Sequence, residues 1–190
     1  MQAIFIENAF WHSSGTEELK QGLVHEAAKQ GLNLQCFTNA DFMLPESVLK
    51  GPRAALFWDK DIRLAMRMEA AGMKLFNNAK AIEVCDDKTL TWIALSRAGI
   101  PMPDTLLVPT TFPAVGFTQL RFLDEAAQML GLPFVVKEGC GSFGQQVYLV
   151  HSVQEAAEVL ARSPGAPMLL QRFIKESAGR DIRAYVVGGK

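Results

Sequence analysis

A glycine pattern with a lysine just before it marks the residues in this sequence that could hold a phosphate group. The stretch VVKEGCGSFGQQVYLV, residues 135–150, places Gly139, Gly141 and Gly144 in the spacing G-x-G-x-x-G, with Lys137 two residues upstream. Glycines let backbone N–H groups approach phosphate oxygens closely, and a lysine adds a positive charge beside them. A glycine-rich turn that happens to follow a lysine is the alternative interpretation.

The flanking residues separate three classes of protein that share these glycines. Both FVVK and QQVYLV are typical of strands, so the glycines join a hairpin, whereas a dinucleotide-binding fold needs a helix after them. A kinase flap needs its lysine on the next strand, but no lysine occurs between Gly144 and Lys175. A Walker loop needs G-K-[ST], which is missing. The pattern therefore favours a glycine hairpin that covers a phosphate group, with Lys137 at its base.

A second group of polar residues follows one expected helix later, in QRFIKESAGRDIRAYVVGGK, residues 171–190. One strand is expected to end at residues 171–174 and another to run through DIRAYVV. Asp181 and Arg183 are two residues apart, so they would share a face of that strand. The acid could accept hydrogen bonds from ribose hydroxyls, and the arginine could bind phosphate or a carboxylate. A surface ion pair is the alternative.

The elements that must position these residues fall into two parts. In the first part, apolar runs alternate with helical patterns, which predicts a parallel sheet and a small open α/β domain over residues 1–85. The expected strands cover residues 3–7, 34–38, 54–59 and 74–78, and the expected helices cover 16–31 and 61–72.

From Asp86 the rhythm changes, and strands are expected to pair as hairpins in an α+β arrangement over residues 86–190. Asp86 or Asp87 is a plausible N-cap for the first of its helices. The expected helices cover residues 86–100, 122–133 and 152–162, and strands precede and follow the last two. Residues 109–119 are expected to form a surface loop.

The composition indicates an ordinary water-soluble globular protein. Of the 190 residues, 49% are hydrophobic and 21% charged, and the net charge of −1 provides no basic surface for direct nucleic-acid binding. No apolar run is long enough to span a bilayer, and the first residues do not resemble a signal peptide. The three cysteines and three histidines show no metal-ligand spacing, so we expect a reduced cytoplasmic protein without a metal site of its own.

Three segments taken in order resemble the ATP-grasp superfamily, and most closely its RimK-type branch of ribosomal-protein-modifying glutamate ligases. The segments are CDDKTLTWIALSRAGIPMPDT, VVKEGCGSFGQQVYLV and LLQRFIKESAGRDIRAYVVGGK. The resemblance covers roughly residues 80–190. It implies a Rossmann-like pre-ATP-grasp α/β domain over residues 1–85 and the N-terminal, ATP-binding part of an α+β ATP-grasp domain over 86–190.

The resemblance also implies roles for individual residues. Lys88 and Lys137 match the two ATP lysines, the second near the α- and β-phosphates. The flap over the phosphates corresponds to Gly139, Gly141, Ser142, Phe143 and Gly144. The segment that hydrogen-bonds the adenine edge through its backbone corresponds to Gln171, Arg172, Phe173 and Ile174. Asp181 matches an acid that contacts ribose, and Arg183, the candidate catalytic residue, matches a position that faces phosphate or substrate.

The implied activity is ATP-dependent ligation of a carboxylate to an amine through an acyl phosphate, with Mg²⁺ as cofactor. The partners would be ATP and small-molecule or peptide carboxylates and amines, with homo-oligomer formation possible. Relatives usually carry Gln-Glu-Phe-Ile at the adenine edge, where this chain has Arg172 in place of the acid. The chain ends at Lys190, before the acidic and Asn residues that hold Mg²⁺ in relatives, so we expect an incomplete and inactive portion of a ligase.

Two other functions stay open from the sequence. A nucleotide-binding or regulatory module without catalysis would keep the hairpin and lack the metal-binding half, whereas an NAD-dependent oxidoreductase is disfavoured by the strand after Gly144.

Asp59, Lys60 and Arg63 follow the third expected strand, at the edge where open α/β sheets bind ligands. They could touch a substrate, or they could simply cap a helix and pair along it. Cys140 lies in the flap and is either oxidisable or simply small.

Overall fold

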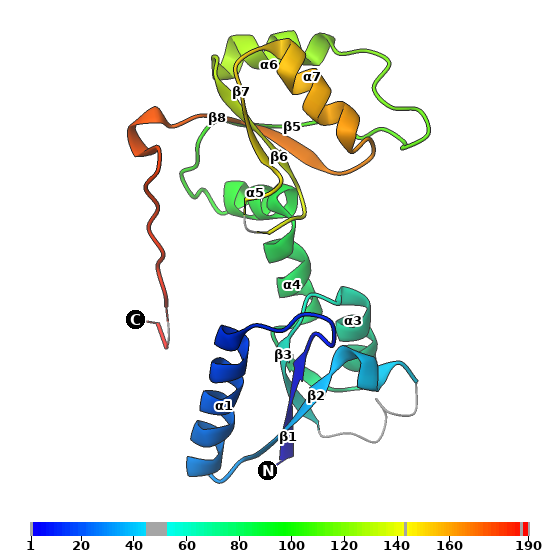
Figure 1. Cartoon of the computed structure of the whole chain (residues 1–190), viewed down its shortest axis with the longest axis vertical. Coiled ribbons are helices and arrows are strands. Elements are labelled where there is room, and N and C mark those ends of the chain that lie inside the picture. The colour runs from blue at the N-terminus through cyan, green and yellow to red at the C-terminus, as the bar shows by residue number, and fades with distance from the viewer. Residues whose placement is uncertain (1, 45–52, 143, 187, 190) are drawn as a thin grey trace. The chain divides into compact units, whose positions relative to one another are not determined.

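The chain divides into two compact units, Met1–Asp86 and Asp87–Lys190, each with its own sheet (Figure 1). The computed structural model describes residues 2–44, 53–142, 144–186 and 188–189. In these ranges no helix combines the length and the apolar character needed to cross a membrane. Each unit is described by itself below.

The first unit is built on a four-stranded parallel sheet in the order β2-β1-β3-β4. Its strands are β1 (Gln2–Glu7), β2 (Asn33–Thr38), β3 (Ala54–Trp58) and β4 (Lys74–Phe76). Glu7 lies opposite both Thr38 and Trp58, so the first three strands end at the same edge of the sheet. The loops that follow them must therefore meet at that edge.

Helices flank this sheet, and two of them turn buried apolar residues toward it. The helices are α1 (Ser14–Lys29), the short η1 (Asn39–Phe42), α3 (Ile62–Ala70) and α4 (Ala79–Asp86). The Ser13 side chain accepts a hydrogen bond from the Thr16 N–H, and Asp61 accepts one from Leu64, so both helices begin at a satisfied N-cap. Buried residues of α3 and α4 pack on Ile4, Ile6 and Phe57 of the sheet to form the core.

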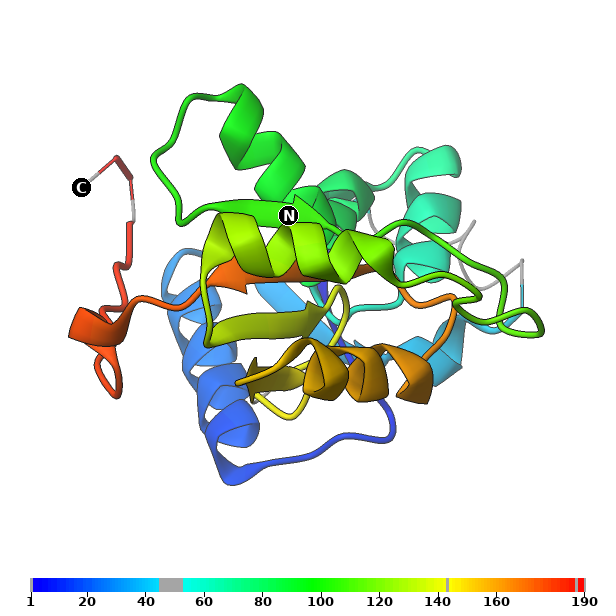
Figure 2. The ribbon, with the colours of Figure 1, turned by 90° about the horizontal axis from the view of Figure 1, so that it is seen from above.

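The second unit holds a four-stranded antiparallel sheet in the order β5-β8-β6-β7. Its strands are β5 (Thr105–Leu107), β6 (Phe134–Glu138), β7 (Val147–Val150) and β8 (Met168–Arg172). Its helices are α5 (Lys88–Arg97), α6 (Arg121–Leu130), α7 (Val153–Arg162) and the short η2 (Lys175–Ser177). Figures 1 and 2 show α6 and α7 side by side over one face of this sheet.

The two faces of the second sheet differ because side chains alternate along each strand. Phe134 and Val136 of β6, together with Leu170 of β8, are buried against α6 and α7. Lys137 of β6 and Gln171 of β8 therefore belong to the opposite face, where α5 contacts β8. This second face carries the polar residues that the sequence singled out.

The predicted fold class is confirmed, with a parallel α/β unit first and an antiparallel sheet with helices after it. The two aspartates left open as N-caps are resolved in favour of Asp87, whose carboxylate accepts hydrogen bonds from Thr89 and Leu90. The segment 109–119 contains no helix or strand, as expected.

Two expectations about elements need correction. The sequence analysis missed α4, although Asn78 signals its start by accepting a hydrogen bond from Ala81 at 2.7 Å. The strand expected through DIRAYVV is wrong, because residues 181–186 form no regular element. A strand needs a neighbour to satisfy its backbone groups, and within the described ranges no strand pairs with this segment.

Candidate active site

The face of the second sheet opposite α6 and α7 carries a chain of hydrogen bonds that begins at Lys137. Its ammonium nitrogen donates to Gln171 Oε1 at 2.7 Å, and Gln171 Nε2 donates to the Thr105 hydroxyl at 2.8 Å. That hydroxyl in turn donates to the carbonyl oxygen of Pro103 at 2.8 Å. The chain crosses β6, β8 and β5, so it fixes the direction of the Gln171 amide and holds the lysine along the sheet.

Lys137 is a poorly compensated cation. Burial and, second to it, the nearby positive charge of Lys88 lower the pKa of Lys137 below its ordinary 10.5. Within the described residues its ammonium forms no ion pair with a carboxylate. Its charge is therefore available to an anion placed between it and Lys88.

Lys88 lies at the base of the glycine loop, on the first turn of α5. Its backbone N–H donates to the carbonyl oxygen of Gly139 at 2.8 Å. Its ammonium nitrogen donates to the same oxygen at 3.2 Å and to the carbonyl oxygen of Gly141 at 3.1 Å. The structure thus brings the two predicted lysines to the same end of the sheet, with Lys88 attached to the loop itself.

The loop between β6 and β7 has no room for a side chain at Gly139. A Cβ there would lie 2.7 Å from Asp87 Oδ1 and 3.1 Å from the carbonyl oxygen of Pro167. The Gly139 N–H donates to that same carbonyl at 2.6 Å, so the backbone is held on both sides. This close approach, and not only the freedom of a turn, explains the glycine.

Further along the loop, Gly144 adopts a positive φ of 73° and its carbonyl accepts a hydrogen bond from Val147, where β7 begins. The Gln146 side chain packs against Gly141, and its Oε1 is buried without a hydrogen-bond partner in the described part of the chain. Ser142 and Cys140 also lie in this loop, and the Cys140 residue is exposed. Phe143 lies outside the described residues.

Residues 171–174 lie at the opposite end of the sheet from the glycine loop. Gln171 faces the lysine, whereas the Arg172 guanidinium bonds Asp104, at 2.7 Å through Nη2, and the Met129 carbonyl at 3.2 Å. Phe173 and Ile174 line a cavity of about 540 Å³ with residues that include Leu149. The Arg172 side chain therefore points away from the face that carries Lys137.

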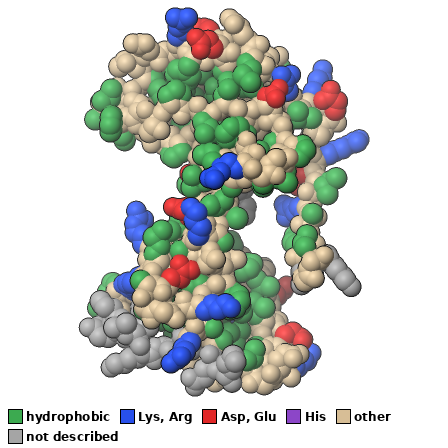
Figure 3. Space-filling model, turned by 180° about the vertical axis from the view of Figure 1, so that it is seen from behind, with side chains coloured by type: hydrophobic (Ala, Val, Ile, Leu, Met, Phe, Trp, Pro, Cys, Tyr) green, Lys and Arg blue, Asp and Glu red, His purple; other side chains and the backbone are tan. Residues whose placement is uncertain are grey.

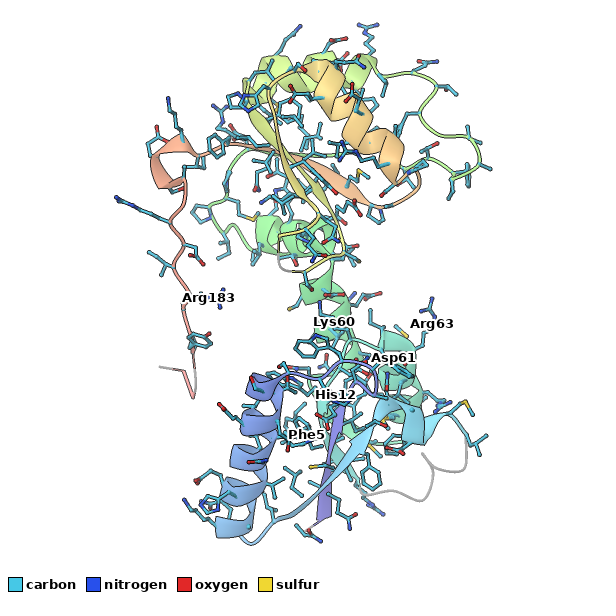
Figure 4. All side chains as sticks on the ribbon, in the orientation of Figure 1. Phe5, His12, Lys60, Asp61, Arg63 and Arg183 are labelled. Carbon is cyan, nitrogen blue, oxygen red and sulfur yellow. The ribbon has the colours of Figure 1, made fainter. Side chains whose placement is uncertain are left out.

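Asp181 and Arg183 are not brought to this group. Their side chains are 84% and 79% exposed, and they form an ion pair with each other at 3.7 Å. Figure 4 shows Arg183 on the C-terminal segment that follows η2 and forms no strand. The structure thus places the two lysines, the loop and Gln171 on the second sheet, and leaves Asp181 and Arg183 apart from them.

The first unit contains the other residues that the sequence singled out. Asp59 Oδ1 accepts a hydrogen bond from Asn8 at 3.1 Å, which joins the loops after β1 and β3, and Lys60 forms an ion pair with Asp86. Arg63 lines a cavity at the carboxyl edge of the parallel sheet. Within the described ranges, no cluster of three or more His, Cys, Asp or Glu residues could hold a metal ion.

Sequence reasoning missed two contributors to the site. Thr105 was noted only as part of a strand, and Gln146 only as part of a hairpin, yet the first anchors Gln171 and the second packs beneath the loop. The direction of Arg172 could have been found, since neighbours on a strand point to opposite faces. The Thr105 contact could not, because it depends on the register of β5 against β8.

The sequence of this chain is similar to those of several known proteins. A family model described as "RimK-like ATP-grasp domain" matches residues 85–190. Beta-citrylglutamate synthase B of Mus musculus is 35% identical over 145 residues, which are 75% of this chain and 36% of that protein. N-acetylaspartylglutamate synthase A of Homo sapiens is 34% identical over 162 residues, which are 84% of this chain and 40% of that protein.

The fold also has a solved counterpart. The crystal structure of D-cycloserine synthetase DcsG aligns with a TM-score of 0.71 at 18% identity, covering 95% of this chain and 61% of that one. This likeness concerns the fold alone. The present chain spans between a third and two-fifths of the length of the two curated relatives named above.

Proposed function

The chain belongs to the RimK-like ATP-grasp family, and from that membership we propose that it binds ATP on the face of its second sheet opposite α6 and α7, as part of a carboxylate–amine ligase. The observation that carries the proposal is the partly buried Lys137, with its lowered pKa and no carboxylate partner among the described residues, beside a glycine loop that admits no side chain at Gly139. A cation desolvated in this way is poised for an anion.

The proposed nucleotide lies along β6. Its phosphates would sit under the loop that contains Gly139, Gly141, Ser142, Phe143 and Gly144. Its adenine would sit at residues 171–174. From Phe134 to Glu138 the strand advances four residues, about 13 Å, which separates the two ends of the site. Lys137 lies at the phosphate end of this span, and the apolar side chains of Phe173 and Ile174 lie at the other.

Lys88 would bind the phosphates from the other side of the loop. In the structure its ammonium donates hydrogen bonds to the Gly139 and Gly141 carbonyls. A phosphate oxygen is a stronger acceptor for an ammonium than a neutral carbonyl is. We therefore infer that Lys88 holds the loop in place before the nucleotide arrives and gives up part of that contact to it.

The remaining roles rest on family membership. Asp181 is proposed to contact ribose, and Arg183 to face phosphate or substrate, although both are exposed in this structure. ATP would supply the phosphoryl group that activates a carboxylate for attack by an amine. Among the described residues no cluster of three or more His, Cys, Asp or Glu residues could hold a metal ion, and no step through Mg²⁺ is assigned to them. We further propose that these 190 residues do not complete ligation, a proposal that ATP-dependent amide formation by this chain would contradict.

The direct test of the proposed function is calorimetric titration of the 190-residue chain with ATP, GTP and NAD. We expect ATP to bind more tightly than either competitor. Tighter binding of NAD would instead support an oxidoreductase and overturn the proposal. For the ligation assay glutamate is the first amine to supply, because the names of both relatives described above contain it.

ATP binding is expected to take up a proton at alkaline pH. In the folded protein the pKa of Lys137 lies below 10.5, so the charged form of this lysine lowers the free energy of unfolding at neutral pH. That free energy rises again as the pH increases from the lowered pKa to 10.5. A bound phosphate favours the charged form and raises this pKa again. Calorimetric titration with ATP across this pH range, in two buffers of different ionisation enthalpy, should show proton uptake on binding. The uptake should be absent in Lys137→Met. Proton release would contradict it.

Arg172 lines the same cavity as Phe173 and Ile174, but its guanidinium is already bonded to Asp104 and the Met129 carbonyl. Arg172→Ala is therefore expected to leave ATP affinity within about twofold of the original. The ion pair is about half exposed, so its loss should cost no more than about 1 kcal/mol of unfolding free energy. Thermal unfolding and ATP titration of the same sample measure both. A large loss of ATP affinity with little loss of stability would show that Arg172 faces the nucleotide.

A further inference from the structure

A second cavity lies in the first unit, at the edge of the parallel sheet where β1, β2 and β3 end. The cavity measures about 780 Å³. Its walls come from the loops that follow these three strands and from the first two turns of α3. Because the three strands end at the same level of the sheet, the segments that follow them lie close together at this edge. The carboxyl edge of an open parallel sheet is where such folds bind ligands.

Two arginines on one face of α3 line this cavity. Arg63 and Arg67 are four residues apart, so their side chains are neighbours on the helix and repel each other. Among the residues that the structure describes, neither forms an ion pair with an acid. Arg67 donates to the Met43 carbonyl at 3.2 Å, and its Nε is buried without a partner. An anion between the two guanidinium groups would offset their mutual repulsion and would accept a hydrogen bond from Arg67 Nε.

Two other charged side chains line the cavity, and both have a partner. Lys60 is paired with Asp86, and the Asp61 carboxylate accepts the Leu64 N–H as the N-cap of α3. Figure 4 shows Lys60, Asp61 and Arg63 together at the start of this helix, with the Arg63 side chain extending from it. The Asp61 carboxylate keeps its negative charge, so two guanidinium groups outweigh one carboxylate at this cavity and favour an anionic ligand.

Apart from Asn39, the rest of the wall is apolar. Phe42 and Ile62 line the cavity, together with Phe10, which is 85% exposed. In Figure 3 hydrophobic side chains lie beside Lys and Arg on the surface of the first unit. A ligand that fits such a wall combines its negative charges with a short hydrocarbon body, which inorganic phosphate lacks.

We propose that this cavity binds a small dicarboxylate, held by Arg63 and Arg67 against the apolar wall. A carboxylate accepts two parallel hydrogen bonds from one guanidinium group, and two carboxylates on a short carbon spacer can engage both arginines. That the dicarboxylate is the acid to be ligated rests on the proposed function. Binding itself does not, since the cavity lies within the first unit and no nucleotide is needed to measure it.

The test is a titration of the full 190-residue chain with succinate in the absence of ATP, followed by amide chemical shifts. We expect saturable binding with shifts at α3 and η1. Arg63→Gln should weaken it about tenfold or more, because a charge-assisted contact is lost. Arg63 is exposed and unpaired in the described structure, so this substitution should not disturb folding. Arg53→Gln is the matched control, because it removes the same charge just before β3, at the opposite edge of the sheet, and should leave affinity within about twofold.

Three results would overturn the proposal. One is the absence of succinate binding up to about 10 mM. Another is binding that Arg63→Gln leaves unchanged, and the third is inorganic phosphate binding as tightly as succinate. ATP titration of the same samples keeps the two hypotheses apart, since loss of ATP binding with intact succinate binding would count against the proposed function alone.

Discussion

Replacing Lys137 by methionine is expected to weaken ATP binding by about 10- to 100-fold. A hydrogen bond to a charged group contributes about 1.5–3 kcal/mol, and methionine keeps most of the side-chain volume while removing the charge. The protein itself should not lose stability at neutral pH, because the lost charge is a partly buried one whose pKa is already lowered. Calorimetric titration gives the affinity, and thermal unfolding gives the stability.

Two further variants make this prediction specific. Lys80→Met removes a lysine that is 76% exposed and paired with Glu83 in the first unit, and it should leave ATP affinity unchanged. Lys137→Arg keeps the charge and should recover part of the affinity. If Lys137→Met bound ATP as tightly as the unchanged protein, the phosphates could not lie beside this residue.

Replacing Gly139 by alanine is expected to disrupt both the loop and ATP binding. The added Cβ would meet Asp87 Oδ1 at 2.7 Å and the Pro167 carbonyl at 3.1 Å. Asp87 cannot turn aside cheaply, because its carboxylate caps α5 through Thr89 and Leu90. Overpacking of this kind costs about 1–3 kcal/mol of unfolding free energy. Denaturant unfolding measures the cost, and we expect ATP affinity to fall by about tenfold or more as the loop shifts.

Gly144→Ala is the matched comparison within the same loop. A Cβ at this position meets nothing within 4 Å, so only the positive φ of 73° opposes the change. That strain costs about 1–2 kcal/mol without moving the base of the loop. The two alanines should therefore differ more in ATP affinity than in stability. Equal losses of affinity would mean that general loop flexibility, and not the packing at Gly139, governs binding.

The fold could be predicted where the signals are local. Alternating apolar runs and helical patterns gave the parallel sheet of the first unit, and the strand after Gly144 gave the antiparallel pairing of β6 with β7. The two mispredicted elements lacked either a clear boundary with the next helix or a partner strand. The eight residues of α4 connect to α5 through the single cap Asp87, so two helices follow each other almost without interruption. The apolar DIRAYVV segment has strand composition, but β-propensity alone does not make a strand.

The candidate site was predictable in its residue types and less so in its contacts. The sequence pointed to Lys88 and Lys137 and to the glycine loop, all of which meet at one end of the second sheet. The bonds from Lys88 to the loop carbonyls and from Gln171 to Thr105 depend on how distant segments come into register. No pattern in a single sequence specifies such contacts, because each joins residues more than fifty positions apart.

The most direct test of the central claim is to map ATP onto the chain by amide chemical shifts. If the phosphates lie under the glycine loop and the adenine at the end of β8, the largest shifts on addition of ATP should fall within residues 136–146 and 171–174 and at Lys88. The amides of α6 and α7, behind the sheet, should move little. Shifts confined to the parallel sheet of the first unit, or no shifts at saturating ATP, would contradict the account.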